Sequence, residues 1–129
     1  MFDKTPLGKA PIIAFLPITD AAPAKAFYGD ALGLKFIEDS PFALVFEGGG
    51  TMLRLQKVEA VTPLPGTALG WDVKDIASTI RALKARGVEF LRFERMEQDA
   101  LGIWTSPSGA KVAWFKDPDG NNLSLTQFP

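Results

Sequence analysis

The alternation of hydrophobic and polar residues along the chain predicts two copies of the same series of elements. In the first copy, the alternating segment Leu16–Asp20 leads into a stretch with apolar residues at helical spacing, which ends at Gly33. In the second copy, Trp71–Asp75 leads into a similar stretch that ends at Gly87. An aspartate before a helix and a glycine after it are typical helix boundaries. Each half therefore predicts a strand followed by a helix.

Further alternating segments follow each helix and predict three more strands per half. These strands are Gly33–Phe36, Phe42–Phe46 and Met52–Gln56 in the first half, and Gly87–Phe90, Lys111–Phe115 and Asn122–Thr126 in the second half. Glycine-rich or Asp-Pro-Asp-Gly turns join the last two strands of each half. The predicted fold is α+β: two tandem βαβββ modules form a single domain, at about residues 10–58 and 67–127, joined by a proline-rich linker at about 59–66.

A module of this kind covers one face of its sheet with its helix and leaves the other face bare. We therefore expect the helices to lie outside and the curved sheets to surround a cleft. Because side chains alternate along a strand, one parity is expected under the helices: Leu16, Ile18, Leu53, Leu55, Leu69, Trp71, Val73, Leu123 and Leu125. The opposite parity assigns to the cleft Ile13, Phe15, Pro17, Met52, Arg54, Gln56, Ala68, Gly70, Asp72, Asn122, Ser124 and Thr126.

The second half carries an insertion of about fifteen residues, roughly Met96–Ala110, which contains Ile103 and Trp104. This segment either covers the cleft or forms a surface loop anchored by one aromatic side chain. Trp114 either stacks on a planar ligand or packs within the sheet, because alternation alone does not assign its face.

Composition removes several classes of function. The 129 residues include no histidine and no cysteine, which excludes catalytic triads, thiolate nucleophiles and disulfides. With 14 basic and 15 acidic residues, the chain has no positive field that would attract nucleic acid or an anionic membrane. The N-terminal sequence has no targeting pattern and the chain has no long apolar run, so we expect a cytoplasmic protein.

Several motifs together resemble the vicinal oxygen chelate superfamily of glyoxalases, bleomycin-resistance proteins and dioxygenases. They are Leu16-Pro17-Ile18-Thr19-Asp20, Ala26-Phe27-Tyr28, Leu32-Gly33-Leu34, Val73-Lys74-Asp75 and Phe115-Lys116-Asp117-Pro118-Asp119-Gly120-Asn121-Asn122-Leu123. Their order and spacing cover nearly the whole chain. The resemblance implies the tandem βαβββ fold, a small-molecule ligand and a homodimer.

The resemblance also implies where a metal ion would bind in metal-dependent relatives. Two ligand positions lie seven residues before Asp20 and Asp75, and a third lies seven residues after Asp117. The corresponding residues are Ile13, Ala68 and Ser124, and the fourth position falls near Arg54. Histidine and carboxylate are absent from all four, so we predict no metal and no cofactor, unless other carboxylates take their place.

The function expected from this pattern is metal-independent binding of a small hydrophobic or aromatic molecule in the cleft between the modules. The predicted ligand-binding residues are Ile13, Phe15, Met52, Arg54, Gln56, Ala68, Asp72, Trp104, Trp114 and Ser124. The alternative is a lyase or isomerase of the glyoxalase type that acts on a small carbonyl compound, with Asp72 or Glu47 as base. A structural module with a closed cleft is a third reading.

Arg54 is the most distinctive residue of the predicted cleft. A guanidinium on an apolar surface either binds a carboxylate of a ligand or pairs with an acidic side chain of the protein. Asp72 and Glu47 are the candidate partners, and an exposed position at the end of the strand is a further possibility.

Overall fold

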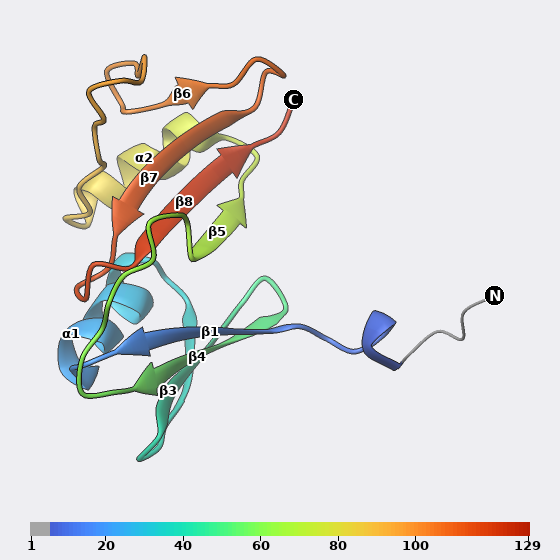
Figure 1. Cartoon of the computed structure of the whole chain (residues 1–129), viewed down its shortest axis with the longest axis vertical. Helices are drawn as coiled ribbons and strands as arrows, with labels where there is room; N and C mark the ends of the chain where they lie inside the picture. The colour runs from blue at the N-terminus through green and yellow to red at the C-terminus, as the bar shows by residue number, and fades with distance from the viewer. Residues whose placement is uncertain (1–5) are drawn as a thin grey trace.

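The computed structural model describes residues 6–129 as two four-stranded sheets, each with its own helix (Figure 1). A short 3-10 turn, η1 (Pro6–Gly8), precedes the first sheet. Module 1 contains β1 (Ile13–Ile18), α1 (Ala21–Lys25), a π-helical segment η2 (Ala26–Ala31), β2 (Lys35–Asp39), β3 (Ala43–Gly48) and β4 (Thr51–Lys57). Module 2 contains β5 (Leu69–Asp72), α2 (Ile76–Ala85), β6 (Trp104–Thr105), β7 (Lys111–Lys116) and β8 (Asn122–Gln127). The predicted tandem α+β fold is confirmed.

The two sheets have the same topology. Their strand orders are β1-β4-β3-β2 and β5-β8-β7-β6, with the first pair parallel and the others antiparallel. Phe15 on β1 lies opposite Arg54 on β4, and Gly70 on β5 lies opposite Ser124 on β8. Arg54 and Ser124 therefore occupy equivalent positions in the two modules, which fixes a register that the sequence left open by one residue.

The predicted helix boundaries are also confirmed. The side chain of Asp20 accepts a hydrogen bond from the backbone N–H of Ala22 at 3.2 Å, and that of Asp75 accepts one from Ser78 at 3.1 Å. Gly33 and Gly87 follow the helices with φ angles of 78° and 90°, which glycine adopts without steric cost. The longest helix of the described chain, α2, has 10 residues, and none of the described helices could span a membrane.

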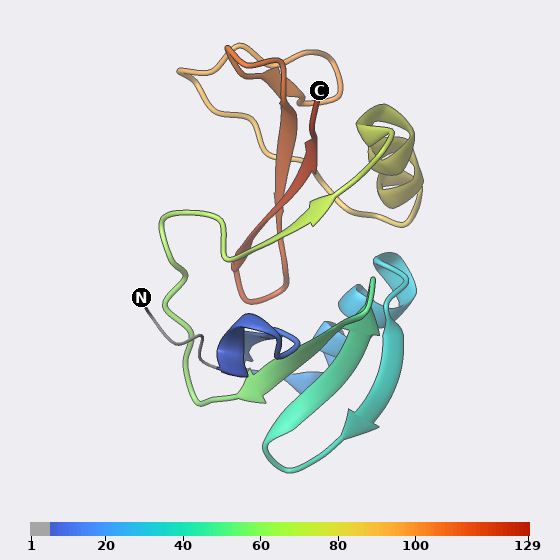
Figure 2. The same cartoon turned by 90° about the vertical axis from the view of Figure 1, so that its right-hand side faces the viewer.

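The helix-covered faces of both sheets form one continuous hydrophobic core. Six of the nine side chains predicted under the helices are buried there: Leu16, Ile18, Leu53, Leu55, Leu123 and Leu125. The other three, Leu69, Trp71 and Val73, are partly buried and pack against this core. The helices approach one another where the modules meet, because the Arg86 guanidinium at the end of α2 donates to the backbone carbonyl of Asp30 at 2.8 Å (Figure 2). The opposite face of each sheet, which we call its open face, carries no helix.

A buried polar junction connects the modules. The hydroxyl of Tyr28 donates to Asp117 Oδ2 at 2.7 Å, and Asn121 Nδ2 donates to the same oxygen at 2.8 Å. Asn121 Nδ2 also donates to the carbonyl of Pro17 at 2.9 Å, so the β7–β8 turn holds the end of β1. Burial, together with the adjacent Asp117 carboxylate, raises the pKa of Tyr28 well above its usual range. The Asp-Pro-Asp-Gly motif is therefore a turn whose first aspartate organises the junction.

Module 2 departs from the prediction after its helix. The expected strand Gly87–Phe90 is wrong, because only Phe90 pairs with the sheet there, through an isolated bridge to Phe115. The chain then leaves the sheet and returns as β6, where Trp104 lies opposite Val112. The insertion therefore interrupts the second strand of this module and supplies a new edge strand farther along.

Candidate functional site

The open face of module 1 exposes large apolar side chains. Ile13 is 45% exposed and Phe15 is 52% exposed on β1, and Met52 is 39% exposed on the neighbouring strand β4. Arg54 and Gln56 lie on the same face, because β1 and β4 pair as Phe15 with Arg54 and Pro17 with Gln56. The five residues predicted on this half of the cleft therefore share one surface.

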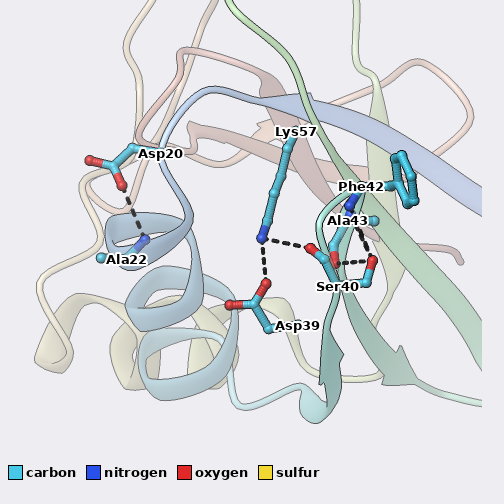
Figure 3. Close-up of polar contacts among 7 residues, drawn as sticks. All are labelled: Asp20, Ala22, Asp39, Ser40, Phe42, Ala43 and Lys57. Carbon is cyan, nitrogen blue, oxygen red and sulfur yellow. Dashed lines mark hydrogen bonds and ion pairs between the residues drawn. The ribbon is translucent and has the colours of Figure 1, made fainter.

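Arg54 has no partner within residues 6–129. It lies between Phe15 on β1 and Val45 on β3, and no hydrogen bond or ion pair joins its guanidinium to another described residue. Lys57, at the end of the same strand, is paired: its ammonium contacts the Asp39 carboxylate and donates to the Ser40 carbonyl at 2.7 Å (Figure 3). The ion pair considered for Arg54 with Asp72 or Glu47 is therefore wrong, and the guanidinium faces outward among apolar side chains.

The open face of module 2 has a different composition. Small or polar residues occupy β5 and β8, and aromatic residues occupy β6 and β7. Trp114 lies opposite Ser124 in the β7–β8 pair, so its side chain is on the open face and not in the core. Its ring is 5.5 Å from that of Phe93 and 6.1 Å from that of Trp104, measured between centroids. The three rings form an aromatic wall beside Ser124.

The insertion is held on both of its sides. Ile103 is buried in the core, whereas the neighbouring Trp104 packs on Trp114 at the open face. The side-chain amide of Gln98 donates to the carbonyls of Leu91 and Gly102, at 3.0 and 2.8 Å, and thereby closes the loop. Next to Trp104 the loop lines a hollow of about 500 Å³ that is open to the surface. The prediction of a surface loop anchored by one aromatic side chain is therefore wrong, because Ile103 and Trp104 anchor the loop to opposite faces of the sheet.

The ten predicted ligand-binding residues separate into two groups. Ile13, Phe15, Met52, Arg54 and Gln56 lie on the open face of module 1, and Ala68, Asp72, Trp104, Trp114 and Ser124 lie on that of module 2. A hollow of about 370 Å³ is lined by both modules, with Asp72 on one side and with Ala14 and Leu53, from the helix-covered face of module 1, on the other. Thus, of the ten, this inter-module hollow takes only Asp72.

Sequence reasoning did not assign a role to Phe93, which belongs to the aromatic wall. Its position in an irregular segment between Phe90 and β6 gives no periodic signal, since alternation applies only to residues within a strand. Its ring could be placed beside Trp114 only once the path of the insertion was known.

The four positions where the family resemblance implies metal ligands do not fit a divalent cation. Ile13 and Ala68 have no donor atom, Arg54 is a permanent cation, and Ser124 offers one neutral hydroxyl. Within the part of the chain that the structure describes, no group of three or more acidic side chains could hold a metal ion. The donor set of these open faces suits hydrogen bonding and stacking with an organic molecule.

Comparison with known proteins agrees with this architecture. The model of the Glyoxalase/Bleomycin resistance protein/Dioxygenase superfamily matches residues 12–125. A glyoxalase family protein from Enterococcus faecalis has a TM-score of 0.72 at 20% identity, over 93% of this chain and 98% of that chain. The glyoxalase/bleomycin resistance protein/dioxygenase from Alicyclobacillus acidocaldarius has a TM-score of 0.70 at 19% identity, over 92% and 91%.

The lactoylglutathione lyase from Agrobacterium tumefaciens has a TM-score of 0.69 at 22% identity, over 92% of both chains. At these identities the structures show the fold alone, and no curated protein matches the chain. The family match spans both modules, from the residue before β1 to Leu125 within β8. This chain therefore belongs to the Glyoxalase/Bleomycin resistance protein/Dioxygenase superfamily.

Proposed function

We propose that this protein binds a small hydrophobic or aromatic molecule with an anionic group, without the help of a metal ion. The observation that carries the proposal is the guanidinium of Arg54, which has no partner among residues 6–129 and lies on an exposed apolar surface. Phe15, opposite it on β1, and Met52, two residues earlier on β4, supply exposed apolar contact area next to it. A carboxylate on a flat apolar body would gain a charge-assisted hydrogen bond from Arg54 and burial against its neighbours.

The absence of metal from the function is supported by the donor chemistry of Ile13, Ala68, Arg54 and Ser124. Elemental analysis of the purified protein tests this part directly. We expect substoichiometric nickel, zinc, iron and manganese, and ligand binding unchanged by a chelator. Stoichiometric metal whose removal abolishes binding would overturn it.

The binding experiment uses 2-naphthoate as the probe and 2-naphthylmethanol, which lacks the charge, as its counterpart in isothermal titration calorimetry. We expect Arg54→Ala to weaken binding of 2-naphthoate by about tenfold or more and to leave the alcohol nearly unaffected. Arg81→Ala, on the exposed surface of α2, is the matched control for loss of a positive charge. Equal affinity of the wild-type protein for both probes would contradict the role of Arg54.

A homodimer is part of the proposal. Residues 6–12, which precede β1, extend away from the body of the chain (Figure 1). Their backbone hydrogen bonds, from Lys9 to Pro6 and from Ala10 to Leu7, stay within this segment. Leu7 and Ile12 there are about four-fifths exposed, next to the apolar open face of module 1. Apolar surface of this extent favours a protein partner, and a second copy would cover it. Sedimentation should show a dimer that Ile12→Asp weakens, and a monomer at all concentrations would refute it.

A second candidate function is proton transfer next to a carbonyl group. Glu47 shares the open face with Arg54, because β3 places it two residues beyond Val45, the partner of Arg54. Glu47 could remove a proton from carbon while Arg54 stabilises the enolate oxygen, before the proton returns at the neighbouring carbon. Incorporation of solvent deuterium into a small hydroxyketone, lost in Glu47→Gln, tests this candidate. No incorporation in the wild-type protein would exclude it for that substrate.

A further inference from the structure

We propose that the open face of module 2 is a second subsite, selective for a planar ring that carries a hydrogen-bond donor such as a protonated amine. The inference rests on the proposed function, since module 2 carries the other five residues predicted to bind the small molecule. Its parts are a floor, made by Gly70, Asp72, Ser124 and Thr126, and the aromatic wall described above.

The first observation is the state of Ser124. Ser124 is only 6% exposed although it lies on the open face, so it sits in a depression between its neighbours. Its hydroxyl makes no hydrogen bond with any residue of the described chain, yet no fully buried polar atom there lacks a partner. The hydroxyl is therefore recessed without being completely buried, and its hydrogen-bonding capacity is not used within the described chain.

The second observation is the absence of a side chain at Gly70. A Cβ built there would stand 3.0 Å from Ser124 Oγ, so the serine hydroxyl occupies the space above the glycine. The equivalent residue of module 1 is Phe15, whose ring covers the same position in that sheet. A glycine inside a strand often marks a place where another molecule approaches the backbone closely. Gly70 thus leaves room for the Ser124 hydroxyl on the side opposite Trp114.

The third observation concerns the two ends of the floor. Asp72 lies beside Thr126, two residues along the strands from the Gly70–Ser124 pair, or about 7 Å. Neither its carboxylate nor the Thr126 hydroxyl has a hydrogen-bond partner in the described chain, and Asp72 carries the only charge on the open face of β5 and β8. Lys116 lies at the opposite end, beside Asn122 on the β7–β8 pair. A cationic donor would therefore turn toward Asp72.

The aromatic wall supplies the remaining contact. Trp114 flanks Ser124 on the side away from Gly70, and Phe93, itself 40% exposed, meets it edge-on at 87°. A ring placed over the floor would contact the Trp114 face, and a positively charged substituent gains further from nearby aromatic rings. The subsite thus selects a donor, whereas Arg54 on module 1 selects an acceptor. One ligand or two could satisfy both faces.

The experiment compares three probes with one ring system: 2-naphthylmethylammonium, 2-naphthylmethanol and 2-naphthoate. Dissociation constants are measured by calorimetry for the wild-type protein and for Asp72→Asn, Ser124→Ala and Gly70→Ala. We expect Asp72→Asn to weaken the ammonium probe by about tenfold or more and Ser124→Ala by a few-fold, without weakening 2-naphthoate. Asp30→Asn, an exposed aspartate near the end of η2, is the control for loss of a negative charge.

The outcomes separate the inference from the function on which it rests. If 2-naphthoate binds through Arg54 but the ammonium probe binds no variant differently, the subsite is refuted and the proposed function stands. If none of the three probes binds the wild-type protein, both are refuted. Far-ultraviolet circular dichroism and thermal unfolding of each variant identify a loss of binding that comes from loss of fold.

Discussion

Modules 1 and 2 share topology and register but differ in the chemistry of their open faces. The helix-covered faces match closely: Leu53 and Leu55 on β4 are buried like Leu123 and Leu125 on β8. On the open faces, the large residues of β1 and β4 are replaced by smaller ones on β5 and β8, whereas Val45 of β3 is replaced by the larger Trp114 of β7. Phe15 corresponds to Gly70, Ile13 to Ala68 and Arg54 to Ser124.

This difference indicates which positions the fold constrains. Residues that pack under a helix must fill a fixed volume, because the interior is densely packed and a change of one methylene group alters the free energy of unfolding. Residues on an open face have no such constraint within the chain. The two open faces could therefore acquire different contacts, a cation among apolar side chains on one and a hydroxyl beside aromatic rings on the other.

The largest expected effect tests the turn that distinguishes module 2. Asp117 accepts hydrogen bonds from Tyr28, from Asn121 and from the backbone of Asp119. Asp117→Ala should lower the free energy of unfolding by about 3 kcal/mol or more, since it leaves the buried Tyr28 hydroxyl and the backbone N–H of Asn121 without an acceptor. Urea unfolding measures the loss. Glu47 accepts a hydrogen bond from the backbone of Gly50 in the β3–β4 turn of module 1, and Glu47→Ala should lower the free energy of unfolding by less than about 1 kcal/mol. Equal losses for the two variants would show that the two turns contribute equally to stability.

The next effect concerns alkaline pH and Tyr28, the single tyrosine of the chain. Above a pH of about 10, Tyr28 loses its proton in the unfolded state but keeps it in the folded state. The free energy of unfolding therefore falls as the pH rises through this range. This group should lower stability by about 1.4 kcal/mol for each further pH unit until the raised pKa is reached. Tyr28→Phe lacks that contribution, and urea unfolding from pH 8 to about 11 compares the slopes. Parallel slopes would contradict the raised pKa.

A smaller effect tests the close approach of the Ser124 hydroxyl to Gly70. Gly70→Ala places a methyl group 3.0 Å from Ser124 Oγ, and we expect a loss of about 1 kcal/mol that Ser124→Ala relieves. A double-mutant cycle on the free energy of unfolding measures this coupling. Gly66→Ala is the control, because an added Cβ there would meet no atom within 4 Å. A coupling near zero would show that the hydroxyl does not occupy the space above the glycine.

The smallest effect is expected for Arg54. Because its guanidinium has no partner within the described chain, Arg54→Ala should change the free energy of unfolding by less than about 0.5 kcal/mol. Arg92, which donates to the carbonyls of Asp99 and Ala100 in the insertion, should cost about 1 kcal/mol when replaced by alanine. Thermal unfolding ranks the two variants. A large loss for Arg54→Ala would give the residue a structural role and weaken its assignment to a ligand.

The sequence by itself determined the repeat, the strand–helix order and the division of each strand into two faces. These features follow from local signals: Asp20 and Asp75 cap helices through their own following residues, and alternation assigns Leu53 and Arg54 to opposite faces. They require no knowledge of what lies across the sheet.

Only the tertiary structure decided the equivalence of Arg54 and Ser124, the face of Trp114 and the path of the insertion. It also showed that Arg54 has no partner in the part of the chain that the structure describes. Each depends on the packing of residues far apart in the chain. The Phe93–Trp114 contact, for example, follows from where the chain leaves the sheet after Phe90. Local periodicity therefore specified which side chains each strand presents, and the pairing of distant segments specified which of them meet.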